Sequence, residues 1–181
     1  MPFRFDYPAE VWAVLPEPDA GRDEEWLDAQ LLIAREQYAD RMDDARAWAE
    51  RALAMRREGI ATSLYFRPPG LPTSGVLHLT FADVVVEDSE FRADDWIPEG
   101  SDPRFDPIVS EFETDASPHG YRVAYVSDQR TPDGAELAGI VYGLRFETGL
   151  ATVFSELSDR ETTGLMQWQA DPIVASLRAE A

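Results

Sequence analysis

The sequence contains no cysteine, no lysine and no asparagine. Without cysteine the chain has no disulfides, thiolate metal ligands or cysteine nucleophiles. Lysine and asparagine both have codons that begin with AA, so their absence indicates a GC-rich genome, such as that of an actinobacterium. No apolar run approaches the roughly 18 residues of a membrane span, and no basic region followed by an apolar one opens the chain as a secretory signal would. We therefore expect a cytoplasmic protein that has no membrane partner.

Motifs for cofactors and catalysis are also missing. The glycines form no dinucleotide fingerprint, no phosphate-binding loop and no nucleophile elbow. Only two histidines are present, His78 and His119, and their local contexts differ, which argues against a zinc site. A Ser-His-Asp arrangement assembled in space stays open. We expect no metal, no cofactor and no catalytic residue, and therefore a protein that is not an enzyme.

Positive charge is scarce. The 35 acidic residues face only 16 basic ones, all arginine, and the formal net charge is −19. Such a surface repels phosphate backbones, which argues against a nucleic-acid partner. Acidity confers solubility and favours a basic protein partner. A DNA mimic, with its acids in spaced rows on one face, is a further alternative.

What is present suits a folded chain. Of the 181 residues, 44% are hydrophobic and 11% aromatic, which predicts one globular domain over residues 1–181. From Asp23 to Arg57 the apolar positions follow helical spacing and form one stripe: Leu27, Leu31, Ala34, Tyr38, Met42, Ala45, Ala49 and Leu53. This segment is either one long helix or two helices that meet between Ala39 and Asp43.

Strand patterns follow the helical segment. Apolar and β-branched runs occupy residues 60–68, 75–86, 121–129, 137–146 and 150–157, with turn residues between them. The last three runs predict a β-meander. Ser158, with Glu161 at capping-box spacing, predicts a final helix whose Leu165, Trp168, Ile173 and Leu177 face the sheet and which Pro172 kinks or restarts. The fold class is thus α+β: a mostly antiparallel sheet with a long N-terminal helical segment and a C-terminal helix packed on it.

Residues 87–119 interrupt this pattern. The insert is acidic, rich in proline and without a sustained period, apart from one expected helical turn at residues 107–112. Long irregular segments in compact domains are often functional. Its apolar residues either pin the insert to the core or contact a partner; the candidates for partner contact are Phe91, Trp96, Ile97 and Phe105, with Ile108 as a further apolar anchor.

Three residues could line a ligand site. His78 lies between Leu77 and Leu79 in a predicted strand, so its side chain lies on the opposite face, where it either lines a cleft or is an ordinary sheet histidine. Arg67 and Arg145 could hold an anion, or each could pair with a carboxylate. His119 follows a proline in a predicted turn and is expected to be solvated.

The C-terminal pattern resembles a known family. The stretch "AGIVYGLRFETGLATVFSELSD" and the ending "ADPIVASLRAE", with Ile173, Ser176, Leu177 and Arg178, look like the PsbP/Mog1-like α/β/α sandwich over residues 120–181. This resemblance implies a non-enzymatic adaptor, because family members act mostly as binding partners, secretion accessories or assembly factors.

Together these observations favour a protein-interaction module, such as an adaptor, immunity-type or secretion-accessory protein. The insert would carry the contact, and its acids would steer a basic partner. The alternative is an enzyme or small-ligand binder with a cleft on the His78 face.

Overall fold

The computed structural model describes residues 3–87 and 89–179. Within these residues, eight strands form one antiparallel sheet in the order β2-β3-β4-β8-β7-β6-β5, with β9 pairing beside β7. The strands are β2 Trp12–Val14, β3 Thr62–Phe66, β4 Gly75–Ala82, β5 Ile108–Glu111, β6 His119–Arg130, β7 Glu136–Phe146, β8 Gly149–Ser155 and β9 Ser158–Asp159. A separate pair joins β1 (Phe3–Arg4) to β10 (Arg178–Ala179). The expected α+β class and antiparallel sheet are confirmed.

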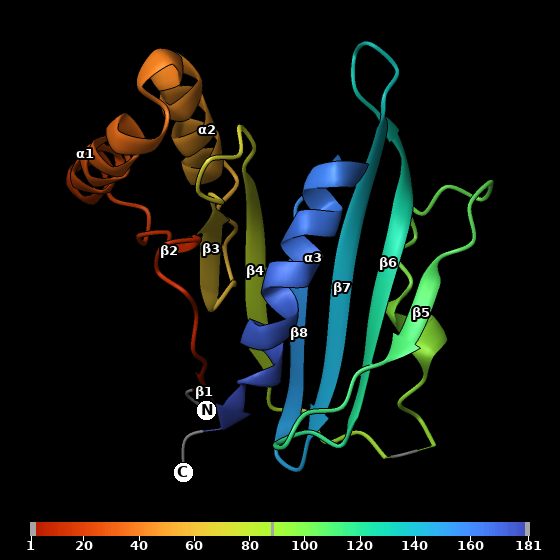
Figure 1. Ribbon diagram of the computed structural model, residues 1–181. Coiled ribbons are helices and arrows are strands. Elements are labelled where there is room, and N and C mark those ends of the chain that lie inside the picture. Colours follow the sequence, from red (N-terminus) through yellow and green to blue (C-terminus); the bar gives the residue numbers. More distant parts are fainter. Residues whose placement is uncertain (1–2, 88, 180–181) are drawn as a thin grey trace.

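Helix α3 (Arg160–Ala175) lies across one face of the sheet, as Figure 1 shows. Its buried residues, including Met166, Ala170 and Ile173, pack against the inward side chains of four central strands. Each Leu or Ile fully buried there contributes about 1.5–3 kcal/mol. The Asp159 side chain caps the helix by accepting a hydrogen bond from the backbone amide of Thr162. The cap therefore lies one residue after Ser158, where the sequence predicted it. Pro172 lies inside the helix, three residues before its end.

The long N-terminal helical segment is two helices. Helix α1 spans Ala20–Gln37 and begins three residues before the expected Asp23, because the Asp19 side chain caps it. A 3-10 turn, η1 (Ala39–Arg41), separates it from α2 (Met42–Ala54). The continuous apolar stripe therefore does not correspond to a continuous helix. The two helices pack beside the β2–β3 end of the sheet (Figure 1), where Ala49 and Ala52 contact Tyr65 and Val76.

The insert has more structure than its sequence indicates. A 3-10 turn, η2, covers Ala93–Trp96, and strand β5 occupies the place of the expected helical turn at residues 107–112. That expectation was wrong because β5 gains its backbone hydrogen bonds from β6, a partner that a local pattern does not reveal. β6 also begins at His119, so this residue opens a strand and stays exposed.

Candidate functional site

The aromatic residues of the insert face the sheet. The Phe91 ring is buried, stacks on Tyr121 at 5.4 Å and meets Trp96 edge-on at 5.6 Å between ring centroids. Trp96 covers Gly143 of β7 so closely that a Cβ atom there would come within 2.1 Å of the indole. Ile97 and Phe105 are half-buried. These positions favour the interpretation in which Phe91 and Trp96 pin the insert to the sheet.

A buried carboxylate also holds the insert in place. Asp102 accepts hydrogen bonds from the backbone and guanidinium of Arg104 and pairs with Arg130 on β6. Hydrogen bonds from Arg104 outweigh burial and lower the pKa of Asp102, so its charge persists at acidic pH. Nearby, the backbone amide of Asp102 donates a hydrogen bond to the carbonyl of Val126. Ser101 also forms an isolated antiparallel β-bridge with Ser127. The chain that leads into β5 is therefore fixed against β6.

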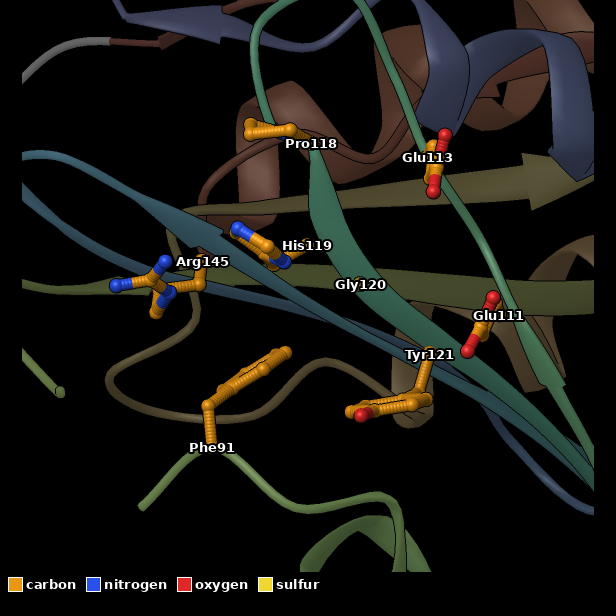
Figure 2. A pocket seen from close by; sticks show the side chains of 8 residues that line it. All are labelled: Phe91, Glu111, Glu113, Pro118, His119, Gly120, Tyr121 and Arg145. Carbon is orange, nitrogen blue, oxygen red and sulfur yellow. The ribbon is translucent and has the colours of Figure 1, made fainter. Parts of the chain in front are cut away.

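Phe91 and Arg145 both line a small polar pocket of about 140 Å³ (Figure 2). His119 and Arg145 are cross-strand partners on β6 and β7, and Arg145 donates to the carbonyl of Val86 at 3.1 Å. Glu111 and Glu113 line the β5 side. The pocket thus combines cationic and anionic groups at the edge of the sheet. Its volume is below the roughly 300 Å³ of a typical ligand pocket.

His78 lies on the face opposite to Leu77 and Leu79, as its position in the strand predicts. It is fully buried, with 0% of its surface exposed. Its Nδ1 lies 2.8 Å from Ser63 Oγ, and its Nε2 lies 3.0 Å from Glu156 Oε1. Because an ionised carboxylate only accepts, Nε2 carries a proton and donates to Glu156. Arg57 also contacts Oε1, at 2.5 Å, so the cluster runs from a buried serine to a surface arginine.

This cluster lies beside a cleft of about 510 Å³. Arg57, Tyr125, Phe154 and Glu156 are among its lining residues, whereas His78 lies beneath them and does not line it. Burial alone would raise the pKa of Glu156, but the hydrogen bond from His78 and the charge of Arg57 together hold it below its usual value. A buried Ser63 offers no approach for a substrate, so the geometry does not form a working nucleophile.

Arg67 lies apart from both of these sites. Its guanidinium donates to the carbonyls of Ala9 and Glu10 at 2.8 and 3.3 Å, near the end of β3 under helices α1 and α2. The structure therefore does not bring Arg67, His78 and Arg145 together. The three residues lie in different surroundings, and none of the clefts described above is lined by all of them.

Sequence reasoning missed a groove between α3 and the β5–β6 edge. It has a volume of about 370 Å³, and its lining includes Phe105, Ile108, Ala124 and Gly164. Ile108 is 71% exposed, although it is a large aliphatic residue in a strand. A Cβ atom at Gly164 would meet nothing within 4 Å, so the helix side of the groove is open there. The exposure of Ile108 could not be predicted, because the sequence pattern did not predict strand β5.

Trp168 lies on α3 one turn beyond Gly164 and is 70% exposed. The expectation that it faces the sheet was wrong. The buried residues of α3, such as Met166, Ala170 and Ile173, define the inward face, and at 100° per residue Trp168 points away from it. An indole exposed to solvent is the kind of group that interfaces use.

The backbone of β5 is open on its outer side. Phe112 donates its amide to the carbonyl of Gly120 at 2.9 Å, which fixes the register of the β5–β6 ladder. Since the direction of the amides alternates along a strand, those of Val109 and Glu111 point away from β6. Among the described residues no backbone group pairs with them. An exposed strand edge of this kind is a template for another strand.

Metal-binding clusters and membrane-spanning helices are both absent from residues 3–87 and 89–179. No group of three acidic or histidine side chains there could hold a metal ion. None of the helices in those residues is both long and apolar enough to cross a membrane. No protein-family model matches the sequence, and no curated protein is significantly similar to it.

Proposed function

We propose that this protein is a non-enzymatic protein-interaction module that binds an extended segment of a basic partner by adding it as a strand to β5. The observation that carries this proposal is the open edge of β5, with Ile108 71% exposed beside the α3 groove. Strand addition uses backbone hydrogen bonds for affinity and side-chain pockets for specificity. Val109 and Glu111 supply the outward backbone groups.

The two faces of β5 specify the chemistry of the partner. Side chains of a strand alternate between faces, so an added segment would place every second residue over the groove and the others over the pocket of Figure 2. The groove offers Phe105 and Ile108, which suit apolar side chains. The pocket offers Glu111 and Glu113, which suit arginine or lysine. The expected ligand therefore alternates apolar and basic residues.

The charge of the whole chain supports a basic partner. At −19, the protein attracts cationic segments and accelerates their encounter at low ionic strength. The insert contributes to binding mainly through its last part, β5, while Phe91 and Trp96 hold that part in position. An adaptor, immunity-type or secretion-accessory role is compatible with this mode of binding, as is the resemblance to the PsbP/Mog1-like sandwich.

Selection from a displayed library of random peptides tests the proposal. Val109→Pro removes an outward amide without touching the ladder to β6, and Val109→Ala is its matched control because it keeps that amide. We expect peptides selected on the wild type to alternate apolar and basic residues, to bind the alanine variant, and to lose at least tenfold in affinity for the proline variant.

A second pair of variants tests the groove. Gly164→Gln adds a long neutral side chain beside the groove, at a position where a Cβ atom would meet nothing within 4 Å, whereas Gly164→Ala adds only a methyl group. We expect the first to weaken peptide binding and the second to leave it unchanged. Selected peptides without alternation, or affinities indifferent to both blocking variants, would overturn the proposal. A dimer in sedimentation that Val109→Pro dissociates would instead make a second copy of the chain the occupant.

A further inference from the structure

Two residues that line a small cavity beneath helices α1 and α2 each have a buried polar atom without a hydrogen-bond partner in the part of the chain that the structure describes. Arg67 is 9% exposed and Gln30 is 8% exposed, and both line this cavity, whose volume is about 20 Å³. Neither Arg67 Nε nor Gln30 Oε1 has a hydrogen-bond partner among the described residues. Buried polar atoms are paired in the great majority of cases, so two such atoms around one cavity indicate a bound species.

The guanidinium in this cavity lacks an ion-pair partner within the described part of the chain, although the charge of Glu10 acts on it from a distance. Arg67 gives two of its hydrogen bonds to the backbone oxygens of Ala9 and Glu10, and no carboxylate in residues 3–87 or 89–179 forms an ion pair with it. Tyr38 and Tyr65 lie beside the guanidinium, and burial raises the pKa of both phenols, so they stay neutral. Burial also lowers the pKa of Arg67, which reflects the cost of holding a cation out of water.

We propose that the cavity is a binding site for one monatomic anion, such as chloride, held by the Nε–H of Arg67. A volume of about 20 Å³ accommodates a species the size of a water molecule or a halide. Water would satisfy Nε–H and Oε1 but would leave the guanidinium without an ion-pair partner. Gln30 forms no hydrogen bond that fixes its amide, so a half-turn of the amide presents its NH₂ group to an anion.

A larger cleft adjoins the cavity. Trp48, Tyr65 and Thr73 line both this cavity and a larger cleft of about 320 Å³ between α2 and the β3–β4 strands. The cavity therefore shares part of its wall with this cleft. It lies at the β2–β3 end of the sheet, far along the strand order from β5, so this site is independent of the proposed strand addition.

Thermal unfolding in sodium bromide and in sodium gluconate, at constant ionic strength, tests this site. Bromide fits the cavity and gluconate does not. We expect bromide to raise the melting temperature of the wild type along a saturating, single-site curve. Arg67→Met should abolish this increment, whereas Arg46→Met, on the exposed side of α2, should retain it. Anomalous scattering from a bromide-soaked crystal should place one ion beside Arg67.

Gln30→Glu keeps the test decisive if Arg67→Met does not fold. A carboxylate at position 30 supplies the counter-charge from within the chain, so this variant should melt higher than the wild type in gluconate and gain nothing from bromide. Equal melting curves of the wild type in the two salts would show that water alone fills the cavity and would overturn the proposal. A bromide increment that survives in Arg67→Met or in Gln30→Glu would overturn it as well.

Discussion

His78 shows, at the scale of single residues, how neighbours determine the chemistry of a side chain. Alternation along β4 predicts its face, but its burial depends on Ser63, Glu156 and the Phe154 ring 5.1 Å away, which come from other parts of the chain. The same holds for the arginines. Arg67 and Arg145 look alike in the sequence, yet Arg145 reaches a pocket at the sheet edge and Arg67 a cavity below the helices. Residue type and spacing gave candidates, and long-range packing decided their roles.

Replacing Phe91 by alanine tests whether the insert is pinned by its aromatic residues. The ring is packed between Trp96 and Tyr121, so Phe91→Ala should lower the free energy of unfolding by about 3–5 kcal/mol. Chemical denaturation measures this loss. Val85→Ala is the control, because Val85 is largely exposed and its change should leave stability within about 0.5 kcal/mol. A Phe91→Ala variant that stays fully stable but loses binding would instead make Phe91 a direct partner contact.

The pKa of Glu156 predicts a dependence of stability on pH. Because this pKa is lowered from 4.5 in the folded state, the carboxylate contributes stability above that pH and loses it as the pH falls through the lowered pKa. Glu156→Gln removes this contribution. We expect the variant to melt lower than the wild type at pH 7, and the gap to narrow as the pH falls below 4.5. A gap of constant size between pH 7 and pH 3 would contradict this account.

At the scale of elements, local patterns predicted some structures well and others poorly. The meander from β6 to β8 and helix α3 could be predicted, because alternation, turn residues and caps are local signals. Strand β5 could not, because four residues between prolines and acids become a strand only through hydrogen bonds from β6. The break between α1 and α2 was one of two open possibilities, since an apolar stripe does not reveal where a helix bends. The proposed edge site therefore lay outside what the sequence could show.

Helix α3 gives a prediction at this scale. Gly164 lies in the interior of the helix on an exposed position, and a Cβ atom there would meet no neighbour. Glycine costs about 1 kcal/mol relative to alanine in a helix interior. Gly164→Ala should therefore raise the free energy of unfolding by about that amount. Gly143→Ala is the informative contrast, because its Cβ atom would collide with the Trp96 indole and should destabilise the protein.

At the scale of the molecule, the sheet separates the two proposed sites in space. The strand order places β2 at one end and β5 at the other, so the cavity below the helices and the open strand edge lie at opposite ends. The pairing of β4 with β8 joins the two halves of the chain, and such an order cannot be read from local patterns. The net charge, in contrast to the strand order, follows directly from the composition, and its effect extends over the whole surface.

The net charge of −19 predicts that salt stabilises this protein in a way that does not depend on the anion. With 35 acidic and 16 basic residues, like charges repel one another across the folded surface. Ions shorten the range of this repulsion, with a screening length of about 10 Å at 0.1 M and about 3 Å at 1 M. Sodium gluconate should therefore raise the melting temperature steeply at low concentration and less at higher concentration. Arg67→Met should keep this rise, because it comes from the surface and not from the cavity. A melting temperature that is flat in gluconate would contradict this account of repulsion across the surface.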